Sequence, residues 1–314
     1  MKISQVIGPR TSEVVEIPDP IPREDEVLVE VVSSGVCASD LGPWLGHSPS
    51  AAPLRLGHEM VGRVVAVGSK ARWWVPGDLV TGLGGHGFAT LAVMDADAVL
   101  PVPPGVEPAH ALGEPVACLE EALSRTGMRA GDRVAVVGLG FMGLSLVQLV
   151  RRHLPGLLVG VDPTPTRRDR ALALGCDLAF APGQIPERYR TATGRESEAR
   201  LDLVIEATGV TPGLTTAGSL VRPFGTLCVV GYHHSGDALM DLELWYKAVT
   251  VVNGFCPDRT RTMAAMREAL GLVAQRRFHY EPLITHHFGL EQVDEAFAAM
   301  LEAGDDFVKA VVVP

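Results

Sequence analysis

The chain has few cysteines and no closely spaced ones, which limits the scaffolds and compartments that suit it. No Cys-x-x-Cys motif is present, and the five cysteines are far apart: Cys37, Cys118, Cys176, Cys228 and Cys256. A disulfide framework needs an even, clustered set, whereas scattered thiols are typical of a reducing compartment. The first ten residues, MKISQVIGPR, also lack the apolar segment of a signal peptide. We therefore expect a cytoplasmic protein.

An excess of positive charge is also missing. The 27 Lys and Arg residues are outnumbered by 37 Asp and Glu residues, which gives a net charge of −10 and a pI of about 5.5. Adjacent basic residues occur only as isolated pairs, such as Arg151-Arg152 and Arg167-Arg168. The basic surface that nucleic-acid binding requires is therefore absent.

No stretch of the sequence fits a membrane span well. The longest uncharged run, 134–150, approaches the necessary length, but it contains three glycines and begins like a strand. A buried strand, a turn and a helix explain this run better than a bilayer span. We expect the partner to be a small molecule rather than a nucleic acid or a membrane.

Length and pattern predict two domains. The 314 residues, 47% of them hydrophobic, suffice for two globular cores. Up to residue 114, β-branched runs alternate with Gly and Pro turns, which indicates a β-rich, barrel-like domain. From residue 115, apolar strands alternate with helical segments, which is typical of a doubly wound parallel sheet. The segment after residue 255 is too short for a third domain, so we predict domains of 1–114 with 256–314, and 115–255.

A glycine motif lies where the first strand of the parallel sheet is expected to lead into a helix. Gly138, Gly140 and Gly143 form the pattern GxGxxG, and Phe141 and Met142 open the helix. The first glycine permits a tight turn, the second admits a pyrophosphate, and the third lets helix and strand pack closely. The helix N-terminus adds amide donors for the phosphates. This context favours a dinucleotide site over a glycine-rich turn without ligand.

An acidic residue follows at the distance that such a site requires. Asp162 lies 19 residues after Gly143, at the end of the second expected strand. A carboxylate there accepts both ribose hydroxyls and repels a 2′-phosphate, so NAD is favoured over NADP. Arg167 and Arg168 follow closely and keep a phosphate-binding alternative open.

A second group of residues has the chemistry of a metal site. Cys37, His58 and Glu59 offer a thiolate, an imidazole and a carboxylate, which suit zinc and leave a coordination position open. The spacing alone is weak, because a buried cysteine and a surface loop would also explain it.

The surroundings of these residues resemble the medium-chain dehydrogenase/reductase superfamily, in particular its zinc alcohol and polyol dehydrogenases. The matching segments occur in the family's order and extend through most of the chain: GVCASD (35–40), LGHEMVG (56–62), VG (67–68), PGDLV (76–80), GLGFMG (138–143), EATG (206–209) and VKAV (308–311). The resemblance implies a discontinuous GroES-like β-rich catalytic domain and a Rossmann domain, with the site in the cleft between them.

The resemblance also implies roles for single residues. Cys37 and His58 correspond to zinc ligands, Glu59 to a carboxylate that ligates zinc in some members, and Glu114 to a third ligand that binds directly or through water. Ser39 resembles the hydroxyl that contacts the substrate oxygen and passes on its proton. Asp40 resembles the carboxylate that orients a zinc ligand.

On the cofactor side, the resemblance places Thr208 and Gly231 beside the dinucleotide. It places Lys309, in the terminal strand, close to the cofactor phosphates. Many of these enzymes are homodimers or homotetramers, so the same is expected for this chain.

The sequence departs from the family pattern in two ways. Four closely spaced cysteines that would hold a structural zinc after residue 80 are missing, so we expect one catalytic zinc and no structural one. The position of the family's relay histidine is Gly42, and His47 or water would have to replace it.

Several further residues can be interpreted in two ways. Glu121 would contact a polar substrate or lie on a solvated helix face; Cys118 would line the nicotinamide pocket or pack in the core. The same choice between a site role and a packing, turn or surface role holds for Trp44, Trp73, Trp74, His233, His234, His286 and His287.

Together these features predict a zinc-dependent, NAD(P)-linked enzyme that interconverts a secondary, polyol, sugar or cyclitol alcohol and its ketone or aldehyde. Two alternatives remain at this point. One is a reductase of the same fold that acts on a C=C or C=N bond without zinc; the other is a relative that binds nucleotide without catalysis.

Overall fold

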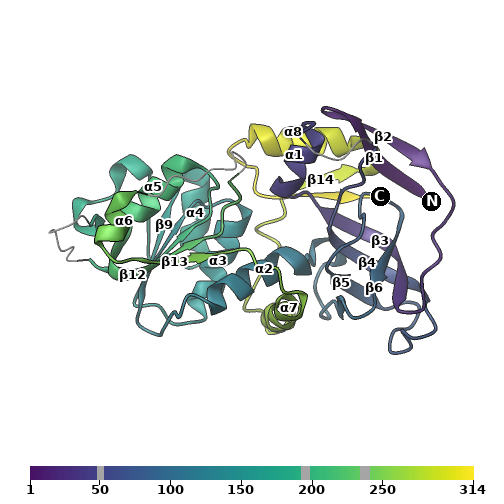
Figure 1. Cartoon of the computed structure of the whole chain (residues 1–314), viewed down its shortest axis with the longest axis horizontal. Helices are drawn as coiled ribbons and strands as arrows, with labels where there is room; N and C mark the ends of the chain where they lie inside the picture. The colour runs from purple at the N-terminus through teal and green to yellow at the C-terminus, as the bar shows by residue number, and fades with distance from the viewer. Residues whose placement is uncertain (48–52, 192–198, 234–240) are drawn as a thin grey trace. The chain divides into compact units, whose positions relative to one another are not determined.

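The computed structural model describes residues 1–47, 53–191, 199–233 and 241–314 and divides into two compact units (Figure 1). The first, here called the β-rich unit, comprises Met1–Ala117 and Met263–Pro314; the second, the parallel-sheet unit, comprises Cys118–Thr262. Helices α2 (Gly113–Ser124) and α7 (Arg259–Ala274) contain the points at which the chain passes from one unit to the other. In the described part of the chain, no helix combines the length and apolar character needed to cross a bilayer.

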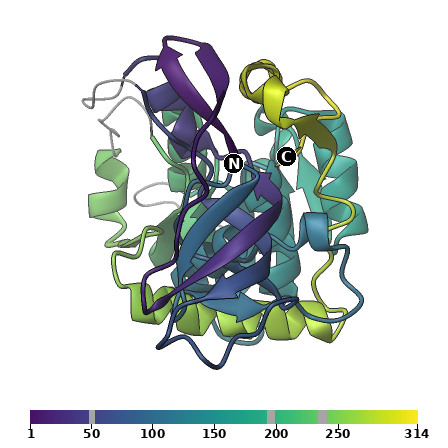
Figure 2. The ribbon, with the colours of Figure 1, turned by 90° about the vertical axis from the view of Figure 1, so that its right-hand side faces the viewer.

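The β-rich unit is built on a sheet with the order β14-β15-β3-β4-β5-β7, in which β6 also pairs with β3. A separate antiparallel hairpin, drawn in purple in Figure 2, consists of β1 (Lys2–Gly8) and β2 (Thr11–Glu16). The remaining strands are β3 (Glu26–Gly35), β4 (Glu59–Val67), β5 (Leu79–Gly82), β6 (Leu91–Asp95), β7 (Val99–Pro101), β14 (His286–Gly289) and β15 (Ala310–Val313).

The C-terminal segment completes the β-rich unit. Strand β15 pairs antiparallel with β3, and α8 (Val293–Glu302) packs beside β14 and β15. Trp44, at the end of α1 (Leu41–Trp44), is buried, stacks on Phe297 with a centroid distance of 5.3 Å, and donates from Nε1 to Asp294. Trp44 is therefore a core residue of this unit.

Six parallel strands form the second unit in the order β10-β9-β8-β11-β12-β13. The strands are β8 (Arg133–Val137), β9 (Leu157–Val161), β10 (Leu178–Phe180), β11 (Leu201–Glu206), β12 (Val221–Val229) and β13 (Thr250–Asn253). Counted along the chain, this order is 3-2-1-4-5-6, the doubly wound arrangement in which ligands bind where the strand order reverses, here between β8 and β11. The predicted fold class is confirmed.

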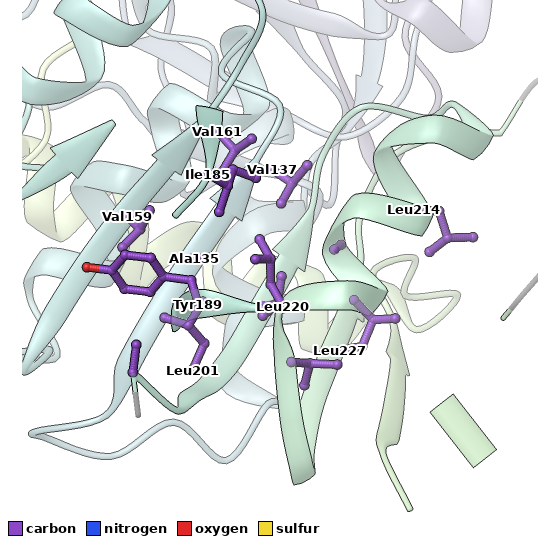
Figure 3. Close-up of a cluster of buried hydrophobic side chains, with 14 of the residues drawn as sticks. Ala135, Val137, Val159, Val161, Ile185, Tyr189, Leu201, Leu214, Leu220 and Leu227 are labelled. Atoms are coloured by element: carbon purple, nitrogen blue, oxygen red, sulfur yellow. The ribbon is translucent and has the colours of Figure 1, made fainter. Parts of the chain in front are cut away.

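Helices connect these strands because the sequence changes from β-branched runs to helical periodicity after each one. They are α3 (Phe141–Arg151), α4 (Pro165–Ala173), α5 (Thr211–Leu220) and α6 (Leu242–Tyr246). Val137, Val159, Leu214 and Leu227 belong to a buried apolar cluster between strands and helices (Figure 3).

The polar segment 183–200 is partly buried in its described portion. Ile185 and Tyr189 belong to the core cluster, within the segment that contains the short 3-10 helices η3 (Pro182–Gln184) and η4 (Glu187–Tyr189). The buried Lys247 provides a hydrogen-bond partner for polar groups in this region. Its Nζ donates to Thr191 Oγ1 and to the carbonyls of Gly218 and Val221. These are carbonyls that the end of α5 cannot satisfy by itself.

Candidate functional site

Strand pairing in the β-rich unit brings the predicted metal ligands together. Strand β3 ends at Gly35, β4 begins at Glu59, and these two residues face one another in the antiparallel register. Cys37 lies two residues after the end of β3 and His58 directly precedes β4, so both reach the same end of the strand pair. Ligand atoms of Cys37, His58 and Glu59 all lie within 4.8 Å of one another. A spacing that was weak in sequence is thus a compact cluster in space.

Two glycines make room for this cluster. A Cβ atom on Gly35 would lie 1.9 Å from Glu59 Oε2, so the carboxylate occupies the space that any other residue would need. Gly57 has φ +94°, and a Cβ there would lie 2.7 Å from the backbone nitrogen of Phe88. A positive φ favours glycine, so the glycines of the matching motifs are explained by local geometry.

Glu59 is buried and its charge is balanced by Lys309. The Lys309 ammonium lies 2.6 Å from Glu59 Oε2 and donates to Oε1 at 2.9 Å. Burial alone would lower the pKa of Lys309, but the negative charges of Glu59, Cys37 and Glu114 outweigh it and raise the pKa. The Lys309 ammonium is thus engaged with Glu59 inside the β-rich unit, and its expected position beside the cofactor phosphates stays a prediction.

Asp40 and His58 form a second charged contact at the same site. Asp40 is buried at the end of the 3-10 helix η1 (Ala38–Asp40), and its Oδ1 lies 3.4 Å from His58 Nδ1. Burial acts to lower the pKa of His58, but hydrogen bonds with Asp40 and Cys37 raise it to about 12. The site therefore favours a positive charge at the position of this imidazole, and a metal cation can take the place of the proton.

The remaining predicted residues of this site lie nearby but outside the three-residue cluster. Ser39 is exposed, and its Oγ donates to Cys37 Sγ at 3.3 Å. Glu114 lies in the first turn of α2, close enough for its charge to raise the pKa of Lys309.

The donor set fits zinc. A thiol, an imidazole and a carboxylate are the side chains that zinc prefers, and a contact from a carboxylate to the imidazole Nδ1 leaves Nε2 available as the ligand atom. Cys37 and His58 are partly exposed, so a further coordination position has access to a small molecule.

In the parallel-sheet unit, the glycine loop has the geometry that its pattern predicts. Gly138 has φ +93°, and a Cβ on Gly143 would lie 1.8 Å from the Gly138 carbonyl oxygen. Gly140, by contrast, has nothing within 4 Å of its Cβ position. Contacts within the protein account for the glycines at 138 and 143. The open space at Gly140, the second glycine of the pattern, is where a pyrophosphate is expected.

The helix that follows the loop presents the expected N-terminal residues. Gly140 is the N-cap of α3, Phe141 is its first residue and is buried, and Met142 is partly exposed.

Asp162 connects the glycine loop to the second strand. Its Oδ2 accepts from the Leu139 amide at 2.8 Å and its Oδ1 accepts from the Thr164 amide at 2.8 Å. Arg168 donates to the carbonyls of Asp162 and Pro163, and the neighbouring Arg167 is half-buried in α4. Asp162 thus orients the loop through both carboxylate oxygens, and its expected contact with the ribose hydroxyls stays a prediction.

Glu206 is a residue whose importance the sequence analysis missed. It ends β11 fully buried, and its Oε1 accepts from the amides of Thr208 and Gly209 at 2.6 and 3.0 Å. Its Oε2 lies 3.2 Å from His233 Nε2, and its own carbonyl accepts from the Gly231 amide at 3.0 Å. The signal for this role was a carboxylate that directly follows the apolar residues 203–205 at the end of the strand.

This arrangement places two of the predicted cofactor residues on adjacent loops. Thr208 and Gly231 follow β11 and β12 at the carboxyl end of the sheet, and Glu206 joins both loops. A Cβ on Gly231 would lie 2.2 Å from the Gly209 nitrogen, so the two loops are in close contact.

Glu121 requires a correction, because it does not lie on a solvated helix face. It is buried, its Oε2 accepts from Arg125 Nε at 2.9 Å, and its Oε1 accepts from Arg261 Nε at 2.8 Å. Burial tends to raise the pKa of Glu121, but the hydrogen bonds from Arg261 and Arg125 outweigh it and lower the pKa. Glu121 is a structural ion-pair residue of the parallel-sheet unit.

The other candidates divide between packing and surface. Trp74 donates from Nε1 to the Ala96 carbonyl and packs on the core, whereas Trp73 is exposed. Cys118 is partly buried. His286 packs on Phe307 with a centroid distance of 5.0 Å. His234 lies outside the described residues.

Comparisons with known proteins agree with this geometry. The family described as "Alcohol dehydrogenase GroES-like domain" matches residues 23–104, and the family "Zinc-binding dehydrogenase" matches residues 141–274. A sorbitol dehydrogenase from Halalkalibacterium halodurans is 26% identical over 333 residues, which cover 96% of this chain and 95% of that protein.

Two further relatives extend the comparison. A protein from Mycobacterium tuberculosis, described as a probable zinc-binding alcohol dehydrogenase, is 34% identical over 69% of this chain and 64% of its own length. The crystal structure of a zinc-binding dehydrogenase from Sinorhizobium meliloti 1021 bound to NADP has a TM-score of 0.88 and 25% identity, and covers 100% of this chain and 99% of that one.

Proposed function

Because this chain belongs to the zinc-type medium-chain alcohol and polyol dehydrogenases, we propose that it catalyses NAD-linked interconversion of a secondary, polyol, sugar or cyclitol alcohol and its carbonyl form. The observation that carries this proposal is the cluster of Cys37, His58 and Glu59, whose ligand atoms lie within 4.8 Å of one another. A thiolate, an imidazole and a carboxylate this close together can all bind the same metal cation.

The proposed roles in the β-rich unit follow from the contacts described. Cys37 and His58 hold one catalytic zinc, Glu59 adjoins it as a ligand or a nearby charge, and Glu114 contributes directly or through water. When bound, zinc acts as a Lewis acid that lowers the pKa of a substrate hydroxyl, and the nicotinamide ring accepts the hydride. Asp40 fixes the orientation of the His58 ring.

Ser39 is the proposed route by which the substrate proton leaves. Its hydroxyl lies 3.3 Å from Cys37 Sγ and is exposed to solvent, so it is adjacent to the ligand cluster and can exchange its proton with water. With glycine at position 42, no histidine side chain is available at the family's relay position, and solvent at Ser39 takes its place in this proposal.

The proposed cofactor site lies in the parallel-sheet unit. Its members are the loop glycines 138, 140 and 143, the helix residues Phe141 and Met142, and the surrounding Asp162, Arg167, Thr208 and Gly231. We propose that NAD is preferred, and the support is the Asp162 carboxylate at the end of β9, where it favours free ribose hydroxyls. One structural relative has NADP bound, so NADP is the alternative against which this preference is to be tested.

A measurement of the ratio of NAD to NADP use tests the cofactor proposal. Asp162→Ala should weaken NAD binding and raise the relative use of NADP. Loosening of the loop, which Asp162 also orients, would lower binding of both dinucleotides together, so the ratio separates the two effects. An unchanged ratio would remove the basis of the NAD preference.

The substrate proposal rests on the relatives. The relative from Halalkalibacterium halodurans, which aligns with nearly the whole chain, is a sorbitol dehydrogenase. We therefore propose polyols and related sugar alcohols as the first substrates to examine.

Metal content and turnover, measured on the same preparation, test the function as a whole. The protein is purified without chelators or a polyhistidine tag, zinc per chain is determined by elemental mass spectrometry, and reduction of NAD is followed with a panel of polyols and secondary alcohols. About one zinc per chain and turnover are expected. Cys37→Ser should lose both, while the partly buried Cys256, changed to Ser, serves as the matched control and should keep both. Turnover by metal-free protein or by Cys37→Ser would contradict the zinc chemistry.

Assembly and location are proposed on separate grounds. Strand β13 is an outer strand of its sheet, and Phe224, Trp245, Tyr246 and Phe255 in the same unit are strongly exposed. We propose that a second copy covers this region in a homodimer or homotetramer. Light scattering of the wild type and of Trp245→Ser tests this assembly. A monomeric wild type would contradict it. The five free cysteines support a cytoplasmic location.

A further inference from the structure

Two histidines from distant parts of the sequence meet on the β-rich unit, apart from the cluster of Cys37. His110 ends the 3-10 helix η2 (Pro108–His110), and His287 lies on the outer strand β14. Their Nε2 atoms are 3.0 Å apart, and their ring centroids are 5.2 Å apart. Nothing in the expected dehydrogenase reaction uses either residue.

Backbone contacts hold the two rings in this position. Ser33 Oγ donates to the Ala109 carbonyl at 2.7 Å, which fastens η2 to β3. His287 is paired with Val311 in the parallel register of β14 and β15. Because side chains alternate along a strand, His286 points to the opposite face, where it packs on Phe307. The meeting of His110 and His287 therefore does not depend on two freely moving side chains.

The charges around the pair favour a cation. Burial lowers the pKa of His110, and the neighbouring His287 lowers it further, so the neutral ring with a free nitrogen lone pair prevails near pH 7. Glu107, which caps η2, and Glu281 act in the opposite direction through their negative charges. Glu281 is exposed and can move.

We propose that His110 and His287 bind a second divalent transition-metal ion of the class that prefers imidazole, such as zinc, nickel or copper. Two nitrogens on one ion are about 3.3 Å apart in tetrahedral zinc coordination and about 2.9 Å apart at a right angle, so the 3.0 Å separation needs little adjustment. Water molecules are available to complete the coordination, because the pair lies at an exposed position.

Such an ion would connect two segments of the fold. The chain runs from His110 through Leu112 into α2, where Glu114 lies in the first turn. A metal at the pair would fix the start of this segment to the edge strand β14. The proposed site shares no residue with the cysteine cluster, so its metal binding can be tested separately from the proposed dehydrogenase activity.

Equilibrium dialysis against Zn²⁺, followed by elemental analysis, tests the site. The full chain is first loaded with one equivalent of zinc and then dialysed against increasing free Zn²⁺, in parallel with His110→Gln, His287→Gln and His153→Gln. His153 is the matched control because it lies in the parallel-sheet unit. The wild type and the control should take up a second equivalent, whereas each of the other two variants should bind it at least about tenfold more weakly. All four should keep the first equivalent, which also shows that they are folded.

Two results would overturn the proposal. One is the absence of a second equivalent in the wild type; the other is a second equivalent that His110→Gln and His287→Gln leave unchanged. A Cys37→Ser variant should lose the first equivalent and keep the second, so a failure of the catalytic zinc is distinguishable from a failure of this site.

Discussion

The metal-ligand cluster and the glycine loop are built in opposite ways. In the β-rich unit, side chains of opposite charge hold one another: Lys309 balances Glu59, and Asp40 contacts His58. In the parallel-sheet unit, the loop exists because side chains are missing, since a Cβ on Gly143 would overlap the Gly138 carbonyl. We therefore expect the cluster to tolerate substitutions only when its charges stay balanced. We expect the glycine loop to keep its function only when no volume is added to it.

The largest effect on stability is expected from a substitution that adds volume to the glycine loop. Gly143→Ala places a Cβ 1.8 Å from the Gly138 carbonyl oxygen, a backbone atom that cannot rotate away. We expect a loss of more than about 3 kcal/mol in the free energy of unfolding, because helix α3 must move from β8. Denaturant unfolding of the purified variant measures this.

Gly140→Ala is the matched control for that substitution. Nothing lies within 4 Å of its Cβ position and its φ is −73°, so stability should change by less than about 1 kcal/mol. NAD affinity should nevertheless fall about tenfold or more, since the methyl group fills the space left for the pyrophosphate. Equal losses of stability in both alanine variants would contradict the distinction between the two glycines.

A charge substitution at the metal site is expected to have the next largest effect. Lys309→Met leaves Glu59 buried without its ion-pair partner, which costs about 3–5 kcal/mol when a buried pair is broken. Addition of Glu59→Gln should recover most of this loss, because the uncompensated charge is removed. A double variant no more stable than Lys309→Met would show that packing, and not charge, is responsible.

Ser39→Ala should have a smaller effect that is confined to catalysis. The hydroxyl is exposed and donates to Cys37 Sγ, so its removal should leave folding intact. We expect turnover to fall by about 10²-fold, the lower end of the range for a proton-transfer group, while NAD affinity is unchanged. Wild-type turnover in this variant would mean that another group carries the proton.

The smallest expected effect is a pH dependence within the parallel-sheet unit. Burial lowers the pKa of Lys247 from its ordinary 10.5, so in the window between the lowered and the ordinary pKa the unfolded chain binds more protons than the folded one. Stability contributed at this residue therefore increases as the pH rises through that window and is constant below it.

Denaturant unfolding of the wild type and Lys247→Met between neutral and alkaline pH measures this difference. The stability of the wild type relative to the variant should increase with pH. A difference that stays constant or decreases would contradict the lowered pKa.

The Rossmann half of the fold was predictable because its signals are local. The apolar strands before Gly138 and Asp162, and the helical periodicity after them, each lie within one short segment. The same locality explains why GxGxxG was informative, since its three glycines act on one turn. Glu121 was less predictable, because its environment includes Arg261, which lies 140 residues further along the chain.

The ion-pair partner of Lys309 could not be predicted from neighbouring residues in the sequence either. Its sequence position directly before the last strand says nothing about Glu59, which lies 250 residues earlier. The pairing of β15 with β3, and of β3 with β4, brings the two charges together.

The sequence by itself determined the fold class and predicted the nucleotide loop and the candidate metal ligands, because periodicity, glycine geometry and side-chain chemistry are properties of short segments. Only the tertiary structure decided which titratable groups are neighbours: Lys309 with Glu59, Arg261 with Glu121, and His110 beside His287. The physical reason is that strand register and chain return set these distances, and neither is encoded within any one segment.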